Sequence, residues 1–216
     1  MSKSVLISIQ PKWCELIASG KKTIEVRKSA PKLETPFKCY IYATKPKNWY
    51  RVNSWGYASD EILLLVNGNV KMCAGLKSWA NDCEYEHLSG KVIGDFVCDS
   101  VDEYILILDY NGDNYSTRDF MYYPLKDACL TQEEIVDYGN GKTLYGWHIS
   151  DLKIYDKPKE LSEIRTICEG IKCDGCEYYY VENNESIGLF KDCLCGCEKP
   201  IKKAPQSWCY IEELEK

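Results

Sequence analysis

The sequence predicts an α+β protein built as a small β-barrel with short appended helices. Three observations lead to this prediction: many short segments of alternating apolar residues, two short helical patterns, and Asn-Gly pairs at 67–68, 111–112 and 140–141 that are typical of turns. The chain has 216 residues, 45% hydrophobic and 28% charged, which allows a hydrophobic core and excludes wholesale disorder.

The first elements follow one another closely. A buried strand is expected at 5–9, where apolar residues occupy both faces. A short helix at 11–19 comes next, starting with a proline and ending before a glycine, the residue that most easily adopts the left-handed conformation. The next segment, 22–27, alternates as a strand, so Glu25 and Arg27 are expected together on the face opposite the core.

Later elements are predicted from the same patterns. Thr131 and Glu134 form a capping box that starts a second helix at 131–139. A module boundary near Arg165 gives a barrel over 1–165, a cysteine-rich insertion over 166–204 and a closing strand over 205–216. Further strands are expected at 38–44, 61–66, 92–100, 104–110, 145–151, 153–155 and 208–211.

Charge is distributed unevenly along the chain. The net charge is -6, but residues 1–60 carry +7 and the remainder carries -13. A basic amino-terminal quarter can attract a polyanion, although soluble surface lysines are an equally good interpretation. The longest aliphatic run, 62–66, is far shorter than the about 20 residues of a membrane span, so no membrane partner is expected. The start of the chain does not resemble a secretion signal, which favours the cytoplasm.

The most specific motif lies where the first helix meets the next strand. Residues 20–27 read G-x-K-x-x-E-x-R, and the ionisable side chains of this pattern are Lys22, Glu25 and Arg27. An arginine presents a planar fork to a phosphate or a base edge, a lysine presents a mobile charge, and a glutamate orients either one or accepts a proton. The alternative is an exposed Glu–Arg pair without function, worth under about 1 kcal/mol.

This motif resembles the hallmark of the ASCH domain family, whose members form PUA-like β-barrels. The similarity covers residues 1 to about 160 and resumes at the closing strand. The resemblance implies an ASCH barrel with a cysteine-rich insertion, and binding of RNA, or another nucleic acid, in a cleft beside the first helix. The residues expected to bind it are Lys12, Lys21, Lys22, Glu25 and Arg27.

The resemblance leaves a second function open. Some family members resemble ribonucleases, and small single-domain relatives are amidohydrolases that act on acylated cytidine with a Lys, a Thr and a Glu. Lys22 matches that lysine, whereas Glu25 stands where the threonine is expected. A hydrolase acting on RNA or on a modified nucleoside would therefore use Lys22 and Glu25. A third alternative is a protein-interaction module, and the sequence leaves the oligomeric state open.

Cysteines mark the predicted insertion. Six of the 13 cysteines fall within 168–197, where a C-x-x-C pair is followed by a C-x-C-x-C run. Two thiolate pairs separated by a loop of this size are typical of a tetrahedral structural zinc site, so zinc is the expected cofactor. A redox dithiol, a disulfide or unliganded thiols are the alternatives. The candidate ligands, of which four are needed, are Cys173, Cys176, Cys193, Cys195 and Cys197.

Aromatic residues admit two interpretations. Trp13, Trp49, Tyr50 and Trp55 alternate with basic residues, as in a groove where bases stack, but β-rich proteins also use such rings for packing. For Trp147 the strand context favours the core.

Overall fold

The computed structural model describes residues 3–47, 62–73, 85–104, 106–108, 115–117, 125–167 and 200–214. No helix in these ranges is long and apolar enough to cross a membrane. The helices are α1 (Pro11–Ala18), α3 (Leu125–Ala128) and α4 (Gln132–Gly139), with a 3₁₀ turn, η2 (Leu161–Glu163). The strands are β1 (Lys3–Ile9), β2 (Ile24–Arg27), β3 (Phe37–Ala43), β4 (Leu63–Val66), β5 (Asn69–Met72), β6 (Tyr85–His87), β7 (Lys91–Tyr104), β8 (Leu106–Leu108), β9 (Tyr115–Thr117), β10 (Leu144–Glu160) and β11 (Trp208–Glu212).

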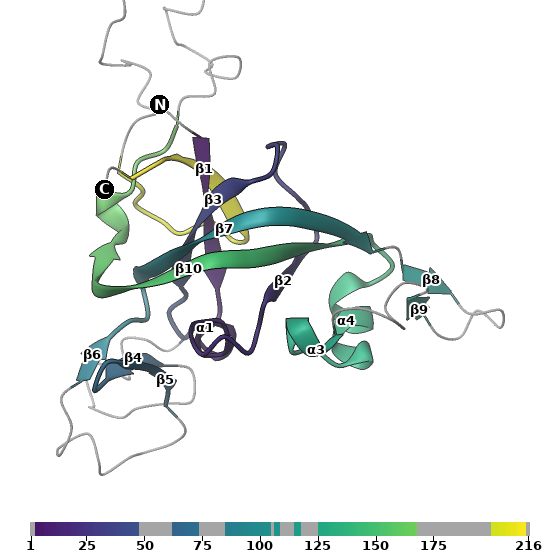
Figure 1. Ribbon diagram of the computed structural model, residues 1–216, viewed down its shortest axis with the longest axis horizontal. Coiled ribbons are helices and arrows are strands. Elements are labelled where there is room, and N and C mark those ends of the chain that lie inside the picture. The colour runs from purple at the N-terminus through teal and green to yellow at the C-terminus, as the bar shows by residue number, and fades with distance from the viewer. Residues whose placement is uncertain are drawn as a thin grey trace, which may run out of the picture.

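One large sheet organises the α+β fold. Its strand order is β11-β1-β3-β7-β10-β2, and only β1 and β3 run parallel. The long strands β7 and β10 cross the whole molecule and connect its two ends (Figure 1). The segments 145–151 and 153–155, predicted as separate strands, are both part of β10, whose register against β7 shifts around Asp151.

The main core lies between α1 and the large sheet. Cys14 and Ile17 of α1 are fully buried against apolar residues of β1, β3 and β7. Trp147 of β10 is also fully buried and meets the ring of Phe37 edge-on at 5.8 Å, which confirms its predicted place in the core. The helix therefore has a fixed position relative to the strands that surround the motif.

The predicted closed barrel is wrong, because the sheet is open. Strands β2 and β11 are its two edges, and no backbone pairing joins them in the described ranges. Side chains bridge this gap instead: Arg27 Nη2 donates to the carbonyl oxygen of Ser8 at 2.7 Å, and Trp208 Nε1 donates to Ser29 Oγ at 3.1 Å. These two hydrogen bonds link the end of the sheet at β2 to the end at β1 and β11 without backbone pairing.

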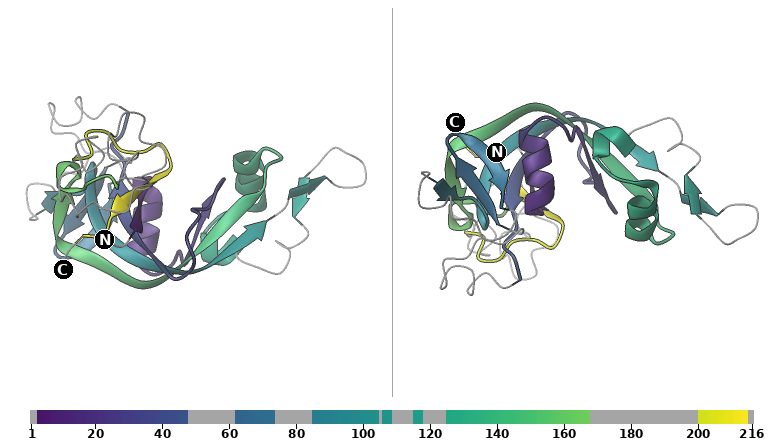
Figure 2. Two further views of the ribbon diagram at one scale, coloured as in Figure 1. Left: turned by 90° about the horizontal axis from the view of Figure 1, so that it is seen from above. Right: turned by 90° about the horizontal axis from the view of Figure 1, so that it is seen from below.

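A second, smaller core positions α3 and α4. Ala128 of α3 and Ile135 of α4 are buried with Ile24 and Val26 of β2. Both helices lie near one end of the long strands and on the same concave side as α1 (Figure 2).

The capping box predicted for α4 is confirmed, and two of the three Asn-Gly pairs, 67–68 and 140–141, have the left-handed backbone expected of them. The third pair, 111–112, lies outside the described residues.

The α4 cap gives the first testable prediction. Thr131 Oγ1 accepts a hydrogen bond from the Glu134 backbone N–H at 3.1 Å, so Thr131→Ala leaves an N–H of the first turn without its partner. We expect the free energy of unfolding to fall by about 1 kcal/mol, measured by urea denaturation. Gln132→Ala, at an exposed neighbouring position, is the matched control. Equal effects of the two substitutions would contradict the role of the cap.

Candidate functional site

The end of α1 determines where the motif begins. Gly20 adopts a φ of +71°, a conformation that other residues adopt only at a cost, and the chain turns there toward β2. The backbone N–H groups of both Lys21 and Lys22 donate to the carbonyl oxygen of Leu16, which closes the helix. Thr23 then donates to Asp127 of α3. Backbone hydrogen bonds to α1 and to α3 therefore fix the position of Lys22, the first charged residue of the triad segment.

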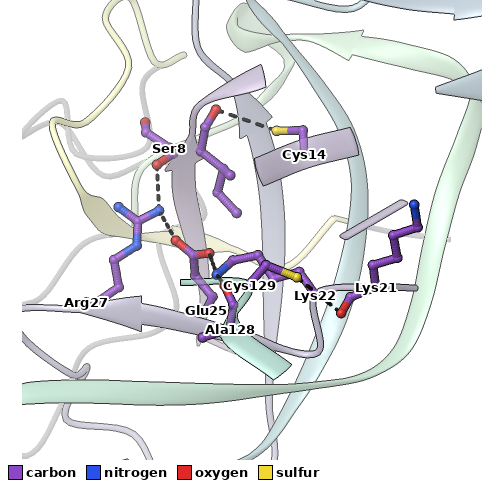
Figure 3. A network of polar contacts seen from close by, with 9 residues as sticks. Ser8, Cys14, Lys21, Lys22, Glu25, Arg27, Ala128 and Cys129 are labelled. Atoms are coloured by element: carbon purple, nitrogen blue, oxygen red, sulfur yellow. Dashed lines mark hydrogen bonds and ion pairs between the residues drawn. The ribbon is translucent and has the colours of Figure 1, made fainter. Parts of the chain in front are cut away.

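Three motif side chains meet in one buried cluster (Figure 3). Glu25 Oε1 lies 2.9 Å from Arg27 Nη2, and Glu25 Oε2 lies 3.5 Å from Lys22 Nζ. The residues Lys22, Glu25 and Arg27 are only 2%, 5% and 8% exposed. We call these three residues the buried triad. The exposed Glu–Arg pair considered as an alternative is therefore excluded.

Backbone carbonyl groups complete the surroundings of the two cations. Lys22 Nζ donates to the carbonyl oxygen of Ala128 at 2.6 Å, and Arg27 Nη2 donates to that of Ser8. Burial disfavours the charged form of the Lys22 ammonium and lowers its pKa, although the neighbouring Glu25 carboxylate acts in the opposite direction. The triad therefore depends on contacts from β1, β2 and α3 together.

Two atoms of the triad lack hydrogen bonds. Glu25 Oε2 and Arg27 Nε are both buried and have no hydrogen-bond partner within the described part of the chain. Glu25 Oε2 has its ion pair with Lys22, but that contact is too long for a strong hydrogen bond. A carboxylate oxygen and a guanidinium N–H of the triad thus have no hydrogen-bond partner in the described part of the chain.

The triad lines a pocket of about 600 Å³ between α1, β2 and α4. Trp13 of α1 and Tyr138 of α4 add aromatic rings to its wall. The Trp13 ring centroid lies 5.0 Å from Lys22 Nζ, and Tyr138 is 37% exposed. Burial raises the pKa of the Tyr138 hydroxyl, so it remains a neutral hydrogen-bonding group at neutral pH. We call this hollow the triad pocket.

The other predicted binding residues lie elsewhere. Lys12 is exposed and lies 3.6 Å from Glu134 Oε1, a residue of the pocket wall, but Lys12 does not itself line the triad pocket. Lys21 is exposed, and its side chain points away from the triad (Figure 3). The structure thus brings Lys22, Glu25 and Arg27 together, with Lys12 nearby and Lys21 outside.

Sequence reasoning missed part of the pocket wall. Tyr138, Asp137 and Leu130 belong to a segment more than a hundred residues from the motif, and no spacing rule links the two. The only sequence pattern in this segment was the capping box, which predicted α4 but not that α4 lies beside the motif. Ser207, just before β11, lines the same pocket and was also missed.

Several predictions concern residues outside the described ranges. The five candidate zinc ligands (Cys173, Cys176, Cys193, Cys195 and Cys197) all lie there, as do Trp49, Tyr50 and Trp55. In the part of the chain that the structure describes, no group of three or more His, Cys, Asp or Glu side chains is arranged to hold a metal ion. The structural zinc site therefore stays a prediction.

Comparisons with known proteins identify the family. The chain matches the model of the ASCH domain over residues 7–124. A crystal structure of ASCH from Zymomonas mobilis is similar with a TM-score of 0.48 and 15% identity, covering 97% of this chain and 88% of that one. A tyrosine-to-phenylalanine mutant of that protein gives a TM-score of 0.49 and 15% identity, with 98% and 92% coverage. No curated protein matches the chain. Because the family model spans more than half of the sequence, the chain belongs to the ASCH domain family.

Proposed function

We propose that the protein binds single-stranded nucleic acid, with RNA as the preferred ligand, by holding one unpaired base in the triad pocket. The pocket volume of about 600 Å³ lies within the range of small-molecule sites and is large enough to admit a base. Proteins that recognise single-stranded RNA stack splayed bases on aromatic rings and form hydrogen bonds with the base edges. The wall of the triad pocket offers both kinds of group.

The observation that carries the proposal is the pair of buried atoms without hydrogen bonds. An unpaired buried polar atom costs about 1–3 kcal/mol, so a ligand that satisfies both atoms binds with a corresponding gain. Glu25 Oε2 accepts a hydrogen and Arg27 Nε donates one. Base edges present donors and acceptors side by side and therefore complement this pair.

The third alternative, a protein-interaction module, accounts less well for the triad. Replacing a buried group of ions by apolar residues is often neutral or stabilising. A domain that served only as a scaffold would have no need of three buried charges beside a hollow. The triad is better explained as a group that contacts a ligand.

The stacking role of Tyr138 is directly testable. Tyr138→Leu removes the exposed ring, and because a stacked base contributes about 1–3 kcal/mol, we expect the affinity for a short single-stranded RNA to fall by roughly five- to 150-fold. Fluorescence anisotropy measures the change. Tyr85→Leu is the matched control, since Tyr85 is 41% exposed and belongs to β6, away from the pocket wall. Equal affinities of the two variants would contradict the proposal.

A second candidate function rests on the lowered pKa of Lys22. A lysine that loses its proton closer to neutral pH can serve as a general base toward a water molecule. Arg27 lines the same pocket and can stabilise the negative charge that develops on a carbonyl oxygen. These roles fit a hydrolase acting on RNA or on an acylated nucleoside.

Lys22→Met tests this second candidate. If the protein hydrolyses acylated cytidine, we expect the substitution to abolish turnover while nucleoside affinity changes less than about tenfold, because general-base catalysis alone contributes about 10²–10⁴-fold. Turnover of the wild type should rise with pH through the lowered pKa of Lys22 and level off below the usual 10.5. Lys21→Met, at the exposed neighbour, is the control. Turnover by Lys22→Met at the wild-type rate, or no turnover by the wild type, would rule out this function.

A further inference from the structure

The triad pocket does not suit the phosphates of a nucleic-acid strand. Its wall carries two cations, Lys22 and Arg27, and three carboxylates, Glu25, Glu134 and Asp137, which gives a net charge of -1. The backbone N–H of Thr131 lowers the pKa of Glu134, so this carboxylate stays ionised. A phosphate entering the pocket would meet this excess of negative charge. The sugar-phosphate backbone of a bound strand must therefore follow another surface.

Two further hollows adjoin the triad pocket. One, of about 370 Å³, shares Gln10 and Thr44 with its wall, and the other, of about 750 Å³, shares Ser8 and Thr44. Because the hollows have wall residues in common, they lie next to the triad pocket.

The adjoining hollows are basic, unlike the pocket. Their walls include five lysines and one carboxylate, that of Glu160, which gives a net charge of +4. Glu160 itself lies 3.7 Å from Lys91 Nζ, a cation outside these walls. We name the five side chains the lysine track: Lys12, Lys45, Lys47, Lys202 and Lys203. All five residues are exposed, and Lys12 among them keeps its ion pair with Glu134.

Three chain segments form the track: Lys12 lies on α1, and the other four lysines lie on two loop segments far apart in the sequence. One follows β3, where Gly90 N–H donates to the Ala43 carbonyl oxygen at 2.7 Å. The other precedes β11 and is held against β1, because Ser8 Oγ donates to the Pro205 carbonyl oxygen at 2.7 Å. The segment before β11 runs beside β1 in Figure 1, coloured yellow. Fixed backbone thus presents the lysines at the edge of the pocket.

We propose that the lysine track binds the phosphates of the same RNA strand whose base occupies the triad pocket, an inference that rests on the proposed function above. Phosphates dominate the affinity of nucleic-acid complexes, whereas base contacts determine selectivity. A pocket of net negative charge beside a surface of net positive charge separates these two tasks. The mixed walls suit a polymer of neutral bases joined by anionic phosphates better than they suit a uniformly acidic peptide.

The salt dependence of RNA binding tests the track. Each phosphate contact to a single strand contributes about 0.7 to the slope of log K against log salt. In fluorescence anisotropy with a single-stranded RNA of about ten nucleotides, Lys47→Gln and Lys203→Gln should each lower the magnitude of the slope by about 0.7, and the double variant by about 1.4. The control is the double variant Lys142→Gln and Lys153→Gln, which removes two exposed lysines outside the three hollows and should leave the slope unchanged.

Three results would overturn the inference. In the first, the wild type binds RNA and Tyr138→Leu weakens that binding, but the double track variant and the control variant have the same salt slope. The proposed function then stands, and the role of the lysine track is wrong. If the wild type binds no RNA, both fail. If polyglutamate competes with the RNA as well as unlabelled RNA does, the track is a site for acidic peptides instead. Binding of free nucleosides should be the same in the wild type and all the lysine variants.

Discussion

The rest of the site depends on a single carboxylate shared by two cations. Glu25 lies between Lys22 and Arg27, and all three are less than a tenth exposed. A buried charge without a partner is strongly destabilising, so each cation requires Glu25, and Glu25 requires the cations. The spacing of the motif follows from this requirement. The strand period places Glu25 and Arg27 on one face, and the turn at Gly20 lets Lys22 reach the same place from the end of α1.

The same cluster lies at the open side of the sheet. The Arg27 side chain extends from the edge strand β2 to the carbonyl oxygen of Ser8 on β1, the strand next to the other edge, β11. The triad pocket lies beside this contact, and residues of α4 form part of its wall. Arg27 and Ser8, which are joined by this hydrogen bond, both line the pocket. The buried charge at the edge of β2 thus lies both at the open side of the sheet and in the wall of the triad pocket.

Local patterns predicted the local structure well. The capping box of Thr131 predicted α4, the Gly20 stop predicted the end of α1, and the motif identified the three residues of the triad. What could not be predicted depends on contacts between distant segments. No spacing in the sequence says that α4 faces the motif, that Ser8 accepts a bond from Arg27, or that the loops before β11 and after β3 line one hollow. Alternation predicted Glu25 and Arg27 on one face, but it could not tell whether other elements bury that face.

The most direct test of this account is a double-mutant cycle on Glu25 and Arg27, read as the free energy of unfolding in urea. Arg27→Met alone leaves the Glu25 carboxylate short of one partner, and Glu25→Gln alone leaves two buried cations together, so each should cost about 3–5 kcal/mol. The double variant has no unpaired carboxylate and should cost clearly less than the two single changes added together. Strict additivity of the two costs, or single changes that cost nothing, would show that the triad is not the interaction on which the site depends.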